Sequence, residues 1–157
     1  MLVEYPLKIM AVFVKEPGTD HPTLRAVRSA VSMLTRPGSS EASPVSPRPA
    51  IRTDIGIHFG LVIFGNIGSR EGRLNNTVIG DTVNTSARLC SAASARPRAS
   101  LLVSETVSTH LGECFSLVRL EPVRLKGKSE PIGLFEVSIS SEQPAVASDF
   151  SGKRHAS

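Results

Sequence analysis

The residues TVIGDTVN at positions 77–84, continued by ARL at positions 87–89, form the most informative segment of this chain. A short apolar pair is followed by Gly-Asp, and an aspartate directly before an apolar-periodic segment is typical of a helix N-cap, so we predict this role for Asp81. The pattern predicts a helix over residues 82–95. Arg96-Pro97 would end this helix because proline cannot continue it.

Two apolar runs and a glycine-rich turn precede this stretch. Residues 51–58 alternate in the manner of a half-buried strand, and residues 61–64 form a second apolar run. The glycines at positions 65, 68 and 72 lack the GxxxxGK[ST] pattern of a phosphate-binding loop. We therefore interpret them as a tight hairpin.

The N-terminal segment predicts one strand and one helix before a break in composition. Residues 9–14 are mostly β-branched or otherwise apolar and predict a strand. Apolar residues recur at three- and four-residue spacing over residues 23–34, which predicts an amphipathic helix. Proline, serine and glycine dominate residues 36–49, and this composition predicts a flexible loop that interrupts a domain.

The C-terminal half predicts short strands around one short helix. A strand is expected at residues 101–103 and a helix from Ser104 to about His110. Closing strands are expected at residues 115–120, 123–125 and 132–139. Helices and strands are thus mixed, with hairpins near the end. This order predicts an α+β sandwich with the helices on one face of a mainly antiparallel sheet.

Composition excludes several classes of protein. The 157-residue chain has a net charge of +4, which suits phosphate-bearing partners but equally describes an ordinary solvated surface. Cys90 and Cys114 are far apart and lack metal-ligand spacing, so free thiols in a reducing cytoplasm are the simplest interpretation. No apolar run approaches the roughly 18 residues of a membrane span, and we see no signal peptide.

Three segments, taken in order, resemble the catalytic domain of bacterial class III adenylate/guanylate cyclases. They are GIHFG at 56–60 with GNIGS at 65–69, the stretch 77–84 with 87–89, and VRLKGKSEP at 123–131. The resemblance implies a ferredoxin-like βαββαβ core with an added C-terminal hairpin. It also implies a head-to-tail dimer with sites across the interface, and conversion of ATP or GTP to a 3′,5′-cyclic nucleotide and pyrophosphate.

The resemblance covers the C-terminal two-thirds of such a domain and divides the chain. Residues 1–35 would be its remnant strand and helix, and residues 36–50 a flexible loop. Residues 51–139 would be the C-terminal part of the domain, and residues 140–157 a disordered tail. The domain would thus be truncated at its N-terminus.

Five residues match positions with known roles in the family. Asn84 would orient the ribose and Arg88 would stabilise charge on the α-phosphate, since four residues place both on one helix face. The spacing alone would favour the simpler interpretation that Asn84 and Arg88 are solvated surface residues. The surrounding GDTVN motif favours the family roles instead. Thr77 would read the purine, favouring ATP over GTP, although an ordinary strand threonine remains possible. Lys126, with Lys128 as a near-equal alternative, would reach the terminal phosphates.

The chain departs from the family at its metal site. The family holds Mg²⁺ or Mn²⁺ on two aspartates, of which the first would precede this chain and the second would fall at Pro6-Leu7. A purine-reading lysine would fall at Val3. Asp54 and Glu4 are the nearest substitutes by sequence, but nothing groups them into a two-metal site. We predict no metal site and no nucleotide cyclisation by this chain alone.

Alternatives remain open. The chain could be a truncated cyclase domain or a non-catalytic subunit that completes the active site of a partner, as a homodimer or a heterodimer with another cyclase domain. A ferredoxin-like nucleic-acid-binding module is less favoured, because aromatic residues make up only 4% of the chain and no RNP motif is present. A cytoplasmic location is expected in each case.

Overall fold

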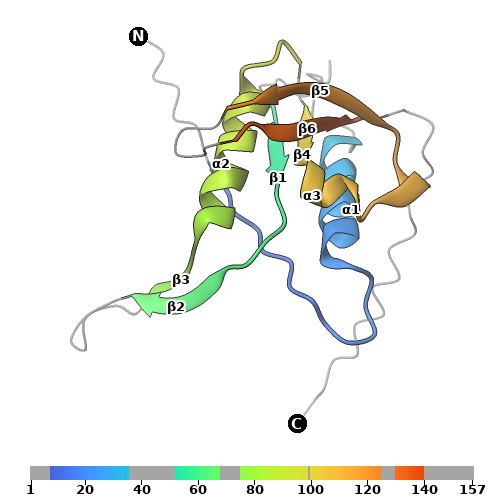
Figure 1. The fold of residues 1–157 in the computed structure, drawn as a ribbon. Coiled ribbons are helices and arrows are strands. Elements are labelled where there is room, and N and C mark those ends of the chain that lie inside the picture. Colours follow the sequence, from blue (N-terminus) through green and yellow to red (C-terminus); the bar gives the residue numbers. More distant parts are fainter. Residues whose placement is uncertain (1–7, 36–51, 68–74, 99, 125–129, 140–157) are drawn as a thin grey trace, which may run out of the picture.

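A computed structural model describes residues 8–35, 52–67, 75–98, 100–124 and 130–139 (Figure 1). Within these ranges, helices and strands alternate along the chain and form a mixed α+β fold, as the sequence predicts. The predicted loop at 36–50 and tail at 140–157 lie outside the described residues. The elements are α1 (Pro22–Thr35), β1 (Ile55–Ile57), β2 (Ile63–Ile67), β3 (Asn75–Ile79), α2 (Asp81–Ser94), β4 (Leu101–Ser104), α3 (Glu105–Ser108), a 3₁₀ turn (Gly112–Cys114), β5 (Leu117–Val123) and β6 (Ile132–Val137).

The main sheet has four strands in the order β1-β4-β6-β5. Strands β1 and β4 run parallel, with Ile55 opposite Leu101. The β4–β6 and β5–β6 pairs are antiparallel, so the sheet is mainly antiparallel, as predicted. The register shifts between Leu120 and Val123, and the two strands predicted at 115–120 and 123–125 are therefore one irregular strand.

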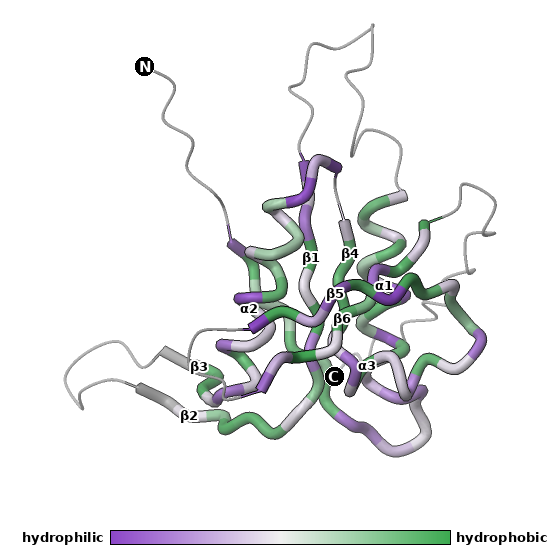
Figure 2. The backbone as a smooth tube through the Cα atoms, turned by 45° about the horizontal axis from the view of Figure 1, so that its top comes forward, coloured by the Kyte–Doolittle hydropathy of each residue, from purple (hydrophilic) through white to green (hydrophobic). Residues whose placement is uncertain are grey.

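Strands β2 and β3 form a separate two-stranded antiparallel sheet. Phe64 lies opposite Val78, and Gly65 opposite Thr77. This pairing confirms the predicted hairpin, although the turn itself lies outside the described ranges. Figures 1 and 2 show the hairpin extending from the start of α2, away from the main sheet.

The largest buried cluster lies between α1 and one face of the main sheet. Val27 and Ala30 of α1 pack there with Leu101 and Val103 of β4, and Ile55 and Ile57 of β1 pack against the same cluster. The periodicity that predicted a helix at 23–34 is confirmed by α1, which begins and ends one residue outside that range.

Helix α2 covers the opposite face of the same strands. Gly56, between the two isoleucines of β1, lies directly against the α2 backbone at Cys90. Leu102, between Leu101 and Val103, lines a cavity together with Ala92 of α2. The prediction that the helices share one face of the sheet is therefore wrong: β1 and β4 lie between α1 and α2 (Figure 1). Adjacent strand residues point to opposite faces, and here both faces carry apolar or close contacts.

Three local predictions are also corrected. Residues 9–14 do not form a strand; Ile9 is 80% exposed, and no strand of the described chain pairs with this segment. The predicted strand 51–58 is reduced to Ile55–Ile57. The N-cap of α2 is Gly80 and not Asp81, which is the first residue of the helix.

Candidate functional site

The close approach of β1 to α2 fixes the position of that helix. A Cβ atom built on Gly56 would lie 2.2 Å from the backbone nitrogen of Cys90, so only glycine permits this spacing. The Ser86 hydroxyl donates a hydrogen bond to the Gly56 carbonyl at 3.0 Å. The Cys90 thiol contacts the Asp54 carbonyl at 3.4 Å. These contacts hold one side of α2 against the strand and leave another side open.

Asn84 and Arg88 lie one helical turn apart outside the buried stripe of α2. That stripe consists of Thr85, Leu89 and Ala93. Asn84 is exposed and Arg88 is half-buried. Residues four apart on a helix are neighbours on its surface, so the helix brings the amide and the guanidinium to one face, as the spacing predicts. Such a pair could donate hydrogen bonds to a sugar and to a phosphate.

A short connection joins Thr77 to the first turn of α2. Thr77 is half-buried on β3, and Gly80 links this strand to the helix with φ 143° and ψ 165°. The Gly80 carbonyl accepts hydrogen bonds from the backbone nitrogens of Val83 at 3.1 Å and of Asn84 at 3.4 Å. The strand that carries Thr77 therefore leads, through three residues, directly into the helix that carries Asn84.

A side-chain contact also ties the start of α2 to the segment that enters β2. The Thr82 hydroxyl donates a hydrogen bond of 2.7 Å to the Leu61 carbonyl. A Cβ on Gly60 would lie 2.6 Å from the same hydroxyl oxygen. Sequence reasoning missed Thr82 as a positioning residue, although its place directly after Gly-Asp at the helix start was a usable signal.

Lys126 and Lys128 lie outside the described residues. The chain that the structure describes stops at Arg124 and resumes at Glu130, on either side of them. Their assignment to the terminal phosphates stays a prediction.

Asp54 belongs to the opposite end of α2 from Asn84. Its carboxylate pairs with Arg52, with Nε–Oδ2 at 2.9 Å, and accepts a hydrogen bond from the Ser100 backbone nitrogen at 3.3 Å. Arg52 also donates to backbone carbonyls at the end of α2, including that of Arg96 at 2.6 Å. This arrangement stabilises the helix C-terminus, where a cation is favourable.

The donor groups of the described residues do not fit a two-metal site. No group of three or more His, Cys, Asp or Glu side chains in these ranges could hold a metal ion. Asp54 is already occupied by Arg52, and Glu4 lies outside the described residues. Residues other than these would have to supply the two-metal site that the resemblance implies.

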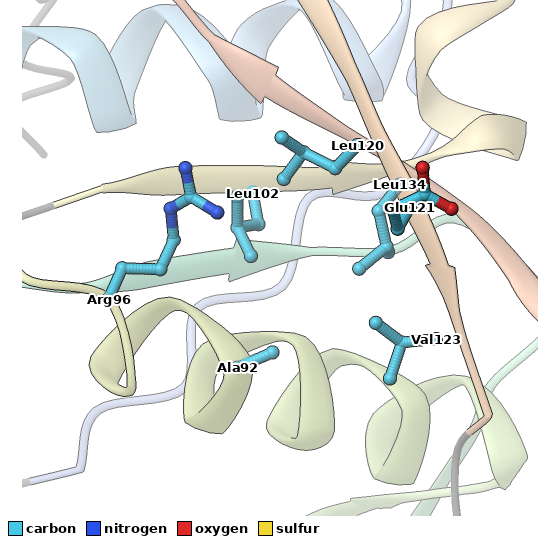
Figure 3. A pocket seen from close by; sticks show the side chains of 7 residues that line it. All are labelled: Ala92, Arg96, Leu102, Leu120, Glu121, Val123 and Leu134. Carbon is cyan, nitrogen blue, oxygen red and sulfur yellow. The ribbon is translucent and has the colours of Figure 1, made fainter.

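An apolar cavity of about 340 Å³ lies between α2 and strands β4, β5 and β6 (Figure 3). Arg96 stands at one end, where its guanidinium pairs with Glu136 at 2.7 Å. Leu102, Leu120 and Leu134 form its apolar wall. The cavity shares no lining residue with the candidate set at Thr77, Asn84 and Arg88.

Large apolar side chains are exposed on the β2–β3 hairpin and the segment before it. Leu61 is 94% exposed, Ile63 65% and Phe64 59%, and Ile79 on the neighbouring strand is 46% exposed. The hydrophobic colouring of this segment is visible in Figure 2. A two-stranded hairpin is marginally stable alone, and contiguous exposed apolar surface is unfavourable in water, which makes this hairpin a candidate for contact with another surface.

None of the helices within the described ranges has the length and apolar character needed to cross a bilayer.

Comparison with known proteins identifies the family. Residues 10–137 match the adenylate and guanylate cyclase catalytic domain. An uncharacterised protein of Mycobacterium tuberculosis is 33% identical over 144 residues, which cover 91% of this chain and 24% of that protein. An adenylate cyclase of Anabaena cylindrica is 38% identical over 92 residues, which cover 57% of this chain and 18% of that protein. The chain thus spans about a quarter or less of the length of these relatives.

Solved structures give the same result. The crystal structure of the guanylyl cyclase Cya2 superposes with a TM-score of 0.65 at 27% identity, covering 80% of this chain and 62% of that chain. A bacterial light-regulated adenylyl cyclase superposes with a TM-score of 0.53 at 25% identity, covering 77% and 58% respectively. With the family match over residues 10–137, these likenesses show that the chain belongs to the adenylate and guanylate cyclase catalytic domain family.

Proposed function

We propose that this chain supplies the nucleotide-orienting part of a class III nucleotidyl cyclase site and is inactive without further residues. One observation carries the proposal: Asn84 and Arg88 share an unburied face of α2, while the opposite side of that helix is fixed against β1 at Gly56. A polar pair on a rigidly seated helix is suited to holding a substrate in one orientation. Family membership favours this role over nucleic-acid binding.

The reaction is an in-line attack of the ribose 3′-oxygen on the α-phosphorus, which forms a 3′,5′-cyclic nucleotide and releases pyrophosphate. Asn84 orients the ribose by hydrogen bonds, and Arg88 stabilises the negative charge that gathers on the α-phosphate. Lys126, or alternatively Lys128, reaches the terminal phosphates. The acceleration that this chain contributes is positional and electrostatic.

Thr77 is the proposed purine-reading residue. Its hydroxyl can accept a hydrogen bond from the adenine amino group. The resemblance of this position to that of bacterial adenylate cyclases favours ATP over GTP as the substrate. Support comes from its place on β3, three residues before the glycine at which α2 begins.

Metal ions supply charge neutralisation and activation of the attacking oxygen in this family. The described donor groups do not fit Mg²⁺ or Mn²⁺ in a two-metal site, so no step is assigned to a metal bound by these residues. A partner chain would have to provide the aspartates that bind these ions. Inactivity of the isolated chain follows from this proposal.

The proposed partner is another cyclase domain, either a second copy or a different chain. The exposed apolar side chains of the β2–β3 hairpin support a partner of this kind, because water contact with Leu61 and Phe64 is unfavourable. A cytoplasmic location, where nucleoside triphosphates are abundant, is part of the proposal.

A complementation assay tests the proposal. The 157-residue chain is incubated with ATP or GTP and Mn²⁺, alone and with a cyclase domain that carries both aspartates but has lost its own α-phosphate-binding arginine. We expect cyclic nucleotide from the mixture only. Arg88→Ala should lower this activity about 100-fold or more, in line with the loss of a transition-state charge partner.

Arg28→Ala is the matched control, because Arg28 lies on α1, away from the candidate residues, and pairs with Asp20, which precedes that helix. This variant should complement as well as the unchanged chain. Turnover by the isolated chain would contradict the proposed inactivity. A mixture that forms product equally well with Arg88→Ala would contradict the assigned role of Arg88.

A further inference from the structure

Three aromatic rings from distant parts of the sequence meet at the start of α1. The imidazoles of His21 and His110 are stacked, with centroids 4.1 Å apart and an interplanar angle of 22°. The Phe59 ring meets both edge-on, at 5.1 Å from His21 and 5.2 Å from His110. We call these three residues the histidine–aromatic cluster. It joins the residue before α1, the segment after β1 and the end of α3.

Hydrogen bonds fix the two imidazole-bearing residues. His21 Nδ1 lies 2.7 Å from the hydroxyl of the buried Thr23, and the His21 carbonyl accepts from the Leu24 nitrogen at 3.0 Å. The His110 backbone nitrogen donates to the Val107 carbonyl at 3.0 Å. The stack therefore links two helix ends whose backbones are themselves ordered.

The charges around the cluster disfavour protonation of His21. Burial, then His110, then Lys15 lower the pKa of His21 below its ordinary value. The two acidic side chains that precede His21, Glu16 and Asp20, pair with Arg25 and Arg28.

The segment after β1 contributes one more titratable side chain near the cluster. His58 directs Nδ1 to the Ser104 hydroxyl at 2.8 Å, so this ring is oriented toward β4.

We propose that the histidine–aromatic cluster is a pH-sensitive contact, closed while the His21 imidazole is neutral and opened when that imidazole becomes protonated. Two neutral rings attract each other through stacking. A positive charge on His21, 4.1 Å from the His110 ring, is disfavoured by burial, by His110 and by Lys15. Opening releases Phe59 together with the start of α1 and the end of α3.

Release of Phe59 reaches the start of α2 through the next two residues. Gly60 packs on the Thr82 side chain, and the Leu61 carbonyl accepts the Thr82 hydroxyl. Acidification should therefore loosen the segment that enters the β2–β3 hairpin as well as the two helix ends. This chain of contacts is independent of any nucleotide chemistry.

The test uses the 157-residue chain and no nucleotide, so its outcome is separate from that of the proposed function. Histidine Cε1–H signals are followed by NMR from pH 8 to pH 5. Backbone amide exchange is measured at pH 7.5 and 5.5 and corrected for intrinsic rates. The reporters are Leu24, whose nitrogen bonds to the His21 carbonyl, and Leu111, which follows His110 and whose nitrogen bonds to the Ser108 carbonyl at 3.1 Å. We expect the titration midpoint of His21 to lie below that of an unstructured histidine. We also expect both amides to lose protection at pH 5.5. The protection factor should fall by about tenfold for each unit by which folding lowers the pKa of His21.

His110→Phe keeps a ring in the stack but removes its charge. This variant should raise the titration midpoint of His21 and keep the two amides protected at pH 5.5. His58→Gln is the control, because it removes a neighbouring imidazole that is not stacked, and it should respond to pH as the unchanged chain does. Unchanged protection between the two pH values in the unmodified chain, or equal loss in His110→Phe, would overturn the proposal. The comparison of the two pH values uses the unmodified chain, so it does not depend on whether a variant folds.

Discussion

The backbone of Cys90 occupies the space that a side chain on Gly56 would need. A Cβ on Gly56 would lie 2.2 Å from the Cys90 nitrogen and 2.6 Å from the Leu89 carbonyl carbon. Both neighbours are helix backbone, which cannot rotate away as a side chain can. The contact therefore sets the distance between β1 and α2, and with it the position of the helix that carries Asn84 and Arg88.

Replacement of Gly56 by alanine should destabilise the chain. Overpacking of a well-packed core costs about 1–3 kcal/mol, and we expect a loss of free energy of unfolding of at least this size. Urea denaturation followed by circular dichroism measures it. Gly65→Ala is the matched control on β2, because a Cβ there meets nothing within 4 Å. Equal stability of the two variants would show that α2 is not seated on Gly56.

Gly80→Ala tests the junction between β3 and α2. Gly80 has φ 143° and ψ 165°, a backbone conformation that is almost confined to glycine. A residue with a Cβ held there costs about 1–3 kcal/mol. We expect a lower melting temperature, and faster amide exchange at Val83 and Asn84, whose nitrogens bond to the Gly80 carbonyl. A variant with unchanged exchange at both amides would contradict this account.

Arg52 should matter more to stability than an ordinary surface arginine. Its guanidinium pairs with Asp54 and donates to carbonyls at the C-terminal end of α2. Loss of hydrogen bonds from a charged donor costs about 1.5–3 kcal/mol. The lower end applies here because the Arg52 side chain is 42% exposed.

Arg28→Ala provides the comparison for Arg52→Ala. Arg28 forms a single exposed ion pair with Asp20, and such pairs contribute about 0–1 kcal/mol. Denaturation of both variants at low and high salt should show a larger and less salt-sensitive loss for Arg52→Ala. Equal losses would mean that the carbonyl contacts of Arg52 contribute nothing.

Local periodicity was sufficient to predict the two long helices, because each of them buries residues that recur every three to four positions. Residues 23–34 and 82–95 were predicted, and α1 and α2 differ by one residue at each end. The strand predicted at 9–14 was wrong because β-propensity reports side-chain preference, whereas a strand also needs a partner for its backbone.

The placement of α1 and α2 on opposite faces had a signal in the sequence. Leu101, Leu102 and Val103 form a continuous apolar run, and all three are buried. Continuous runs of this type indicate strands that are covered on both faces. An alternating pattern would have indicated a strand covered on one face. The apolar run at 101–103 was interpreted only as a short strand, so this signal was not used.

The contacts between side chains were likewise predictable within one helix and not predictable between distant elements. The shared face of Asn84 and Arg88 follows from helical spacing alone, and α2 confirms that geometry. The stack of His21 on His110 has no local signal, because residues tens of positions apart meet only through the tertiary fold. Sequence patterns predict which residues are neighbours on one helix or strand, but they do not predict contacts between elements.

Lys15→Met should make the chain less sensitive to acid. Because the folded pKa of His21 is depressed, the neutral form stabilises the fold fully above the unfolded pKa of about 6.5, and this stability is lost as pH falls below it. Lys15 contributes to the depression, so its removal moves the pKa of His21 upward and reduces the loss. The free energy of unfolding at pH 7.5 and 5.5 measures the difference. Lys8→Met, at an exposed lysine, is the control; equal pH dependence of both variants would contradict the role of Lys15.

Thr77→Val tests purine reading without changing side-chain shape. If the Thr77 hydroxyl accepts from the adenine amino group, its loss costs about 1 kcal/mol, or roughly fivefold in kcat/KM for ATP. If Thr77 selects ATP through this bond, the turnover of GTP should fall less, and the preference for ATP should shrink. Both nucleotides are compared in the complementation assay with Thr35→Val as the control, since the Thr35 hydroxyl donates to the Val31 carbonyl on α1. An equal decrease for ATP and GTP would mean that Thr77 supports the hairpin and does not select the base, because a structural loss on β3 affects both substrates alike.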